Sequence, residues 1–283
     1  MNYLFIIFIF IFGLIIGSFL NALIYRLKVK KSVWQGRSFC PDCKKKLGIW
    51  DLIPVFSFIF LKGRCRYCHK RISWQYPAVE LATGLIFVLI FYYQYLVPKT
   101  YNLTTIFSLI FYLFISSILI VIFVYDLKYS IIPDKVIWPG ISINLIYWLV
   151  GVFFYYIGHQ RVFYQLFPGT YQLTPNPLFI ILGGLISGGF FLILVLVSRG
   201  KWMGGGDVKL GIFMGLFLGF PQILVALFIA FVAGSLISLF LVAWHKKTFK
   251  SQIPFGPFLV LGSFVALFWG VSIINWYLSF LLR

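Results

Sequence analysis

Residues 103–125, LTTIFSLIFYLFISSILIVIFVY, contain no charged side chain, and the run ends at an aspartate, Asp126. A helix of about 20 apolar residues crosses the roughly 30 Å hydrocarbon core of a bilayer. The run is therefore long enough to span a membrane. It predicts a transmembrane helix that brings a carboxylate to one face of the bilayer.

The rest of the chain repeats this pattern. The composition is 61% hydrophobic and 11% charged, with a mean hydropathy of +0.99, which is too apolar for a water-soluble domain. The expected spans are 4–23, 79–97, 103–125, 136–157, 178–197, 208–220, 223–244 and 255–282, of which the sixth is the shortest. The sequence therefore predicts an all-α integral membrane protein with about eight transmembrane helices.

The basic residues set the expected orientation. The formal net charge is +18, but Lys and Arg lie between the apolar runs without a soluble basic fold to present them, so we expect no nucleic acid partner. Cytoplasmic loops are enriched in Lys and Arg. With the N-terminus outside, 21 of the 24 basic residues are cytoplasmic, and Lys99, Arg161 and Arg283 are external. The first expected span, 4–23, has no preceding basic residue, and no side chain between residues 1 and 25 is charged. We therefore expect this span to be a retained anchor rather than a cleaved signal peptide.

The loop 26–77 holds all four cysteines, in Cys40-Pro-Asp-Cys43 and Cys65-Arg-Tyr-Cys68. About fifty residues bury little core, and segments of this size need a metal or disulfides for stability. Two C-x-x-C pairs supply the four thiolates of a closed structural zinc site. Disulfides are the alternative, but a reducing cytoplasm disfavours them. We therefore predict a Zn²⁺ ion bound by these four cysteines.

Only six carboxylates occur in the chain: Asp42, Asp51, Glu80, Asp126, Asp134 and Asp207. Asp207 follows three glycines in Met203-Gly204-Gly205-Gly206-Asp207, and glycine permits close approach of another chain. The predicted topology places Asp126 and Asp207 at the same, cytoplasmic face. Two adjacent carboxyls share one proton and titrate as a unit, as aspartic proteases require. We therefore predict that these two residues are a catalytic pair.

Two other interpretations of the aspartates remain open. Each aspartate alone is compatible with capping a helix or pairing with the nearby Lys128 or Lys209. Alternatively, the same carboxyls would carry protons in a proton-coupled transporter, because ionisable groups in spans are usually functional. Their expected position at one face argues against a path across the bilayer.

The sequence resembles type IV prepilin peptidases over nearly its whole length. The N-terminal stretches that carry this resemblance are Gly17-Ser18-Phe19-Leu20-Asn21, the two cysteine pairs, Asp51-Leu52-Ile53-Pro54-Val55 and Tyr76-Pro77-Ala78-Val79-Glu80-Leu81. The C-terminal stretches are Asp126-Leu127, Ile132-Pro133-Asp134, Gly204-Gly205-Gly206-Asp207-Val208-Lys209-Leu210 and Ile253-Pro254-Phe255-Gly256-Pro257.

The resemblance implies a bacterial inner-membrane aspartic endopeptidase with Asp126 and Asp207 as catalytic residues. Its substrates would be type IV prepilins and pseudopilins, whose basic leader is cut after a glycine. Members with the cysteine loop also methylate the new N-terminus with S-adenosylmethionine, and the resemblance suggests the region of Glu80 and Gly84 for this activity. It also implies an N-terminal region, 1–98, that includes the zinc loop, and a peptidase domain, 99–283.

Overall fold

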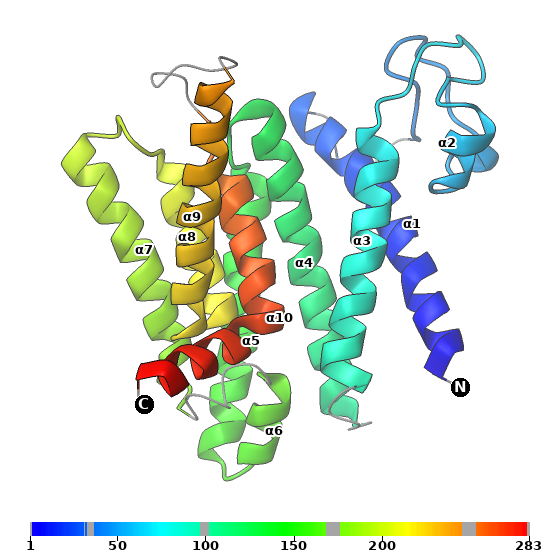
Figure 1. Ribbon diagram of the computed structural model, residues 1–283. Helices are drawn as coiled ribbons and strands as arrows, with labels where there is room; N and C mark the ends of the chain where they lie inside the picture. The colour runs from blue at the N-terminus through cyan, green and yellow to red at the C-terminus, as the bar shows by residue number, and fades with distance from the viewer. Residues whose placement is uncertain are drawn as a thin grey trace. The chain divides into compact units, whose positions relative to one another are not determined.

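The computed structural model describes residues 2–30, 32, 37–96, 102–167, 176–244 and 253–281. This part of the chain is helical, without a β-strand, and contains two isolated β-bridges in the cysteine loop. Figure 1 shows the helices, which in order are α1 (Asn2–Lys28), η1 (Ile49–Asp51), α2 (Phe56–Phe60), α3 (Gln75–Phe91), η2 (Tyr92–Leu96), α4 (Leu103–Tyr129), α5 (Asp134–Tyr156), α6 (Gln160–Leu166), α7 (Leu178–Ser198), α8 (Gly205–Leu218), α9 (Gln222–Ala243) and α10 (Gly256–Leu281).

Seven helices among the described residues are long and apolar enough to cross a membrane: α1, α3 continued by η2, α4, α5, α7, α9 and α10. They coincide with seven of the expected spans, and the prediction of an all-α membrane protein is confirmed. The expected span 208–220 does form a helix, α8, but its 14 residues extend only about 21 Å. It is therefore shorter than the hydrocarbon core. The expected domain boundary at 98/99 and the ends of two spans, Val97 and Leu282, lie outside the described residues.

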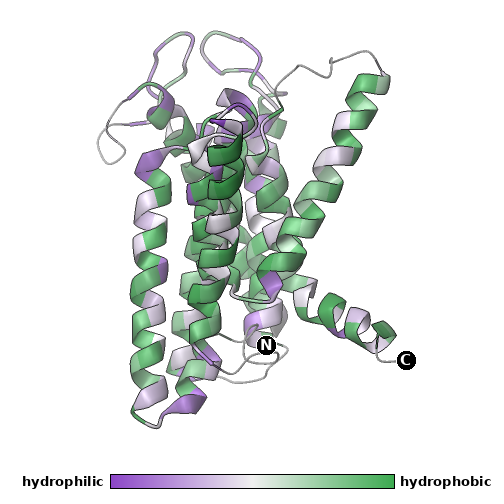
Figure 2. Cartoon of the chain, turned by 90° about the vertical axis from the view of Figure 1, so that its left-hand side faces the viewer, coloured by the Kyte–Doolittle hydropathy of each residue, from purple (hydrophilic) through white to green (hydrophobic). Residues whose placement is uncertain are grey.

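The outer surface of the helices is apolar. Leu85 of α3, Leu149 of α5 and Ile193 of α7 are 58%, 56% and 62% exposed. Figure 2 shows hydrophobic residues along the helices and hydrophilic residues gathered mainly in loops and at helix ends. Such side chains are stable only against lipid or another apolar surface. The chain is thus a multi-pass membrane protein.

The chain divides into two compact units, residues 1–101 with 109–121, and residues 102–108 with 122–283. In the first unit, α1 crosses α3 at small residues: a Cβ atom on Gly13 would lie 2.7 Å from the Cα of Gly84, and one on Gly17 would lie 2.7 Å from the Cα of Glu80. Glycines at such crossings let helix backbones approach closely in a membrane.

In the second unit, α8 packs along α7 in the same way. A Cβ atom on Gly183 would lie 2.7 Å from the carbonyl oxygen of Gly215. The hydroxyl of Ser187 lies 2.6 Å from the carbonyl oxygen of Gly211 and 2.9 Å from that of Gly183. Residue 183 is thus level with 215, and 187 with 211. This register holds the short α8 in a fixed position against the longer α7.

Candidate active site and candidate metal centre

Asp126 lies in the last turn of α4. The helix ends at Ser130, which adopts a left-handed conformation (φ 51°, ψ 39°) and donates its N–H to the carbonyl oxygen of Asp126 at 2.8 Å. A left-handed residue commonly terminates a helix in this way. The Asp126 side chain is buried, at 5% exposure, and its carboxylate accepts a hydrogen bond from the backbone N–H of Gly256.

Asp207 lies in the first turn of α8, and the glycines before it shape this helix start. Its carboxylate accepts the N–H of Gly204, the N-cap residue, at 3.3 Å, as an acidic residue at the third helical position typically does. Gly206 faces Ile132, where a Cβ atom would come within 3.3 Å of the isoleucine side chain. The glycine-rich turn thus combines a capped helix start with close packing on the turn that follows Asp126.

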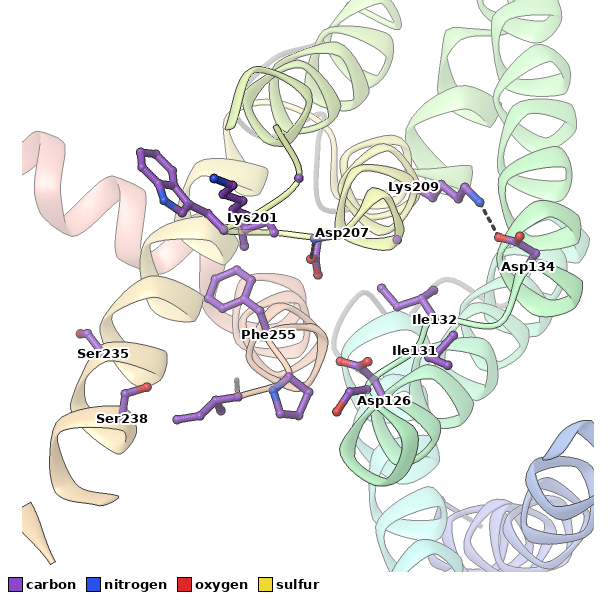
Figure 3. A pocket seen from close by; sticks show the side chains of 18 of the residues that line it. Asp126, Ile131, Ile132, Asp134, Lys201, Asp207, Lys209, Ser235, Ser238 and Phe255 are labelled. Atoms are coloured by element: carbon purple, nitrogen blue, oxygen red, sulfur yellow. Dashed lines mark hydrogen bonds and ion pairs between the residues drawn. The ribbon is translucent and has the colours of Figure 1, made fainter. Parts of the chain in front are cut away.

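Both carboxylates line one pocket of about 980 Å³ within the second unit. Figure 3 shows Asp126 and Asp207 turned into this pocket from different helices. The walls come from the end of α4 and the following turn, the segment before α8, one face of α9 and the segment before α10. The residues that form these walls include Ile132, Trp202, Met203, Ser235, Ser238, Leu239 and Phe255. The pocket is lined by charged and polar side chains as well as apolar ones, and it is wide enough for a segment of peptide chain.

The two aspartates influence each other electrostatically. Asp207 lies outside the seven spans. Burial raises the pKa of Asp207 to about 6, the negative charge of Asp126 adds to the rise, and the hydrogen bond from Gly204 opposes it. A raised pKa keeps one carboxyl protonated at a pH where an isolated aspartate is fully ionised. The pair can therefore hold one proton close to neutral pH.

Lys209 does not pair with Asp207, which corrects one of the alternatives drawn from the sequence. Its ammonium lies 2.5 Å from the carboxylate of Asp134, at the start of α5, and 5.7 Å from the centre of the Trp138 ring. Figure 3 shows this ion pair at the pocket wall. Sequence reasoning missed both this pair and the Gly256–Asp126 hydrogen bond. The only available signal was that the Ile132-Pro133-Asp134 and Pro254-Phe255-Gly256 stretches match the family pattern.

The four cysteines form a second cluster, within the first unit. The Sγ atoms of Cys40, Cys43, Cys65 and Cys68 all lie within 4.8 Å of one another, and those of Cys40 and Cys68 are 3.9 Å apart. All four are free thiols. A tetrahedral Zn²⁺ ion with Zn–S bonds of about 2.3 Å separates its sulfur ligands by about 3.8 Å. The cluster is therefore compact enough to hold a metal ion.

The two cysteine pairs adopt the same local fold. The N–H of Cys40 donates to the carbonyl of Lys45, and that of Cys65 donates to the carbonyl of Lys70, both at 2.9 Å. The residue after each second cysteine, Lys44 or His69, is left-handed, with φ 59° and 55°. Each turn thus presents two sulfurs on one side. His69 is thus a turn residue of the second pair.

Glu80 and Gly84, suggested for methyl transfer, lie at the crossing of α1 and α3. Glu80 is 7% exposed, and its carboxylate accepts the N–H of Val55 at 2.7 Å. A Cβ atom on Gly84 would come within 2.9 Å of the Phe10 ring. Both residues therefore have a packing role within the first unit.

Comparison with known proteins agrees with this architecture. Residues 11–94 match the bacterial peptidase A24 N-terminal domain, and residues 113–239 match the type IV leader peptidase family. Proteins named prepilin leader peptidase/N-methyltransferase are similar along their length. Those of Legionella pneumophila and Bacillus subtilis (strain 168) are each 30% identical, over 95% and 96% of this chain and 93% and 97% of their own. That of Aeromonas salmonicida (strain A449) is 28% identical over 97% of this chain and 94% of its own.

No solved structure matches the chain. The family assignment therefore rests on sequence: two domain models match in the expected order, and several relatives align over more than nine-tenths of both chains. The chain belongs to the type IV leader peptidase family.

Proposed function

We propose that this protein is a membrane-embedded aspartic endopeptidase that removes the leader peptide from type IV prepilins and pseudopilins, with Asp126 and Asp207 as its catalytic residues. The observation that carries the proposal is that these two carboxylates, from α4 and α8, line the same pocket. The names of the relatives support the substrate class.

In the proposed reaction, the ionised carboxyl of the pair accepts a proton from a water molecule. The protonated carboxyl donates its proton to the oxygen of the scissile carbonyl. The water oxygen bonds to the carbonyl carbon. When the C–N bond breaks, the leaving nitrogen takes the proton that the first carboxyl accepted from water, and a hydroxyl of the intermediate returns its proton to the second carboxylate. No covalent acyl-enzyme forms. Either aspartate serves as acid or base, because the pair titrates as a unit.

The substrate is a membrane-inserted precursor with a short basic leader that ends in glycine. We place the pocket and the cysteine loop at the cytoplasmic face of the bacterial inner membrane, with the N-terminus outside, because this orientation puts most Lys and Arg in the cytoplasm. We also propose that residues 1–98 and 99–283 act as an N-terminal region and a peptidase domain.

The peptidase proposal is tested with Asp126→Asn and Asp207→Asn, each in membranes supplied with a prepilin precursor. Loss of an acid or base catalyst should lower the cleavage rate by about 10²–10⁴-fold. Asp42→Asn is the control, because Asp42 pairs with Lys70 at 2.9 Å on the surface of the cysteine loop and does not line the pocket. Cleavage at the normal rate by either active-site variant would refute the assignment.

We further propose that the protein methylates the mature N-terminus with S-adenosylmethionine, with Glu80 and Gly84 in the region that serves this step. The names of the relatives support the activity. Mass spectrometry of the mature substrate, with and without methyl donor, should show a donor-dependent gain of one methyl group. An unmodified amine under both conditions would leave only the peptidase.

We propose zinc as the metal of the four cysteines, because four thiolates are its typical structural ligands.

A further inference from the structure

The cysteine loop exposes a group of large apolar side chains. Ile49 and Trp50 of η1 are 84% and 74% exposed, Phe60 of α2 is 81% exposed, and Trp74, just before α3, is 76% exposed. In a loop that faced only water, large apolar side chains gathered in this way would be costly.

Helix α2 has one apolar face. Phe56, Ile59 and Phe60 are 57%, 62% and 81% exposed, and their spacing of three and four residues puts them on the same side of the helix. We call η1 and α2, residues 49–60, the apolar segment. Figure 1 shows α2 beside the upper end of α3.

Two contacts attach this segment to α3 and to Trp74, which immediately precedes it. The N–H of Val55, which precedes α2, donates to the buried carboxylate of Glu80 at 2.7 Å. Val55 has φ 62°, an unusual conformation for a β-branched residue, and this hydrogen bond helps to hold it. The ring of Phe58 lies 4.8 Å from that of Trp74. The apolar segment is thus held against the helix rather than carried on a free loop.

Trp74 also begins the outer stripe of α3. Leu81, Leu85 and Leu89 are 41%, 58% and 36% exposed, and their spacing continues the face that Trp74 starts. Because α3 with η2 is long and apolar enough to cross a membrane, we expect this stripe to face lipid. The exposed side chains of the apolar segment therefore continue a lipid-facing surface beyond the end of the span.

We propose that the apolar segment is an interfacial membrane anchor that lies in the headgroup region of the leaflet next to the cysteine loop. Trp and Phe are typical of this depth in a bilayer. The partner is anionic phospholipid, since loop 26–77 carries 13 Lys and Arg and only two acidic residues, Asp42 and Asp51. Lys62 and Arg64 lie two and four residues after the end of α2. The anchor would hold the cysteine cluster at the membrane surface.

The test uses the full chain in bilayers that contain lipid brominated near the carbonyl end of its acyl chains. The fluorescence emission of Trp50 is obtained by subtracting the emission of the Trp50→Phe variant from that of the wild type. The control is Trp276→Phe, since Trp276 is 69% exposed on the span α10. Trp50 should lose at least as large a share of its emission as Trp276. The loss should be greater when part of the zwitterionic lipid is replaced by phosphatidylglycerol.

Two outcomes would overturn the proposal. In the first, brominated lipid leaves the Trp50 emission unchanged while aqueous iodide quenches it, so the segment faces water. In the second, Trp50 is protected from iodide only after a prepilin precursor is added, and brominated lipid still has no effect. The segment would then be a docking surface for the substrate. Neither result depends on cleavage, so the peptidase proposal is tested separately.

Discussion

Asp126 occupies a site that leaves no room for a side chain at residue 256. A Cβ atom on Gly256 would lie 2.5 Å from the Oδ2 atom of Asp126. We therefore expect Gly256→Ala to displace the carboxylate and to lower the cleavage rate by about 10²-fold, since misplacement by about 1 Å has effects of this size. Cleavage of a prepilin by the purified variant measures the effect.

The matched control is Gly189→Ala. Gly189 lies in α7, and no heavy atom comes within 4 Å of its ideal Cβ position. This variant should cleave at the wild-type rate. Equal cleavage by both alanine variants would show that the space beside Asp126 is unimportant.

The raised pKa of Asp207 predicts the pH dependence of cleavage. The mechanism needs one proton on the pair, and the pKa of Asp207 is raised to about 6, mainly by burial. The proton is therefore present below this pH and lost above it. We expect kcat/KM to fall by about tenfold per pH unit once the pH exceeds 6 to 7, since kcat/KM reports ionisations of the free enzyme. A rate that keeps rising through this range would contradict the assignment.

The raised pKa of Asp207 also determines how the stability of the fold depends on pH. Because the folded-state pKa of Asp207 lies above the unfolded value, ionisation of this carboxyl destabilises the folded state. Below about pH 4 the carboxyl is protonated in the folded protein, so this destabilisation is absent. Asp207→Asn should therefore be more stable than the wild type at pH 7.5, by roughly 1 kcal/mol after solvent screening. Thermal unfolding at pH 7.5 and pH 4 should show this difference shrink as the pH falls.

At this scale, the sequence was sufficient to nominate Asp126 and Asp207, because six carboxylates leave few choices and the apolar runs predict which ends share a face. The partners of these residues were not predictable. Gly256 lies close to Asp126, and Lys209 pairs with Asp134 rather than with Asp207. Both contacts depend on how segments that are distant in the sequence pack together. Their catalytic roles stay predictions.

At the scale of helices, the ion pair of Asp134 and Lys209 joins the start of α5 to the first turn of α8. Lys209 is two residues from Asp207, so we expect the pair to position that turn. Both side chains are partly exposed, at 63% and 31%, so breaking the pair should lower stability by less than about 1 kcal/mol. Lys209→Met should nevertheless reduce kcat several-fold.

The charge-reversed double variant Asp134→Lys with Lys209→Asp should recover part of that kcat, whereas each single reversal should not. The exposed pair Asp42–Lys70, 2.9 Å apart, serves as the control, and its loss should leave kcat unchanged. If the double variant were as slow as the single ones, Lys209 would act on the substrate rather than on α8.

The helices themselves were largely predictable, because an apolar run near 20 residues has few alternatives to a span. The bounds and the packing of the expected span 208–220 were less predictable. The structure begins α8 at Gly205 and ends it at Leu218. The close packing of Gly183 and Gly215 fixes the register of α8 against α7, and hydropathy carries no information on such a register.

For the whole molecule, we expect metal removal to affect one unit only. Few apolar side chains are buried in the cysteine loop, so the metal should supply much of its stability. Chelation should speed hydrogen exchange at Cys40, Lys44, Cys65 and His69, whose N–H groups form the two turns. The amides of α7 and α8 should be unaffected. Unchanged exchange in protein shown to be metal-free by elemental analysis would refute a structural metal.

In the proposed function, the register of α7 and α8 also sets how far from the end of α7 a peptide bond is cut. Because 187 is level with 211, Asp207 is level with Phe191, seven residues before the end of α7 at Ser198. At about 1.5 Å per residue, residue 207 is level with a point about 10 Å along α7 from this end. A helical stem hides its carbonyls in its own hydrogen bonds. We therefore expect a precursor to unwind locally before its peptide bond reaches Asp207, and a glycine at the cut would lower the cost of that unwinding.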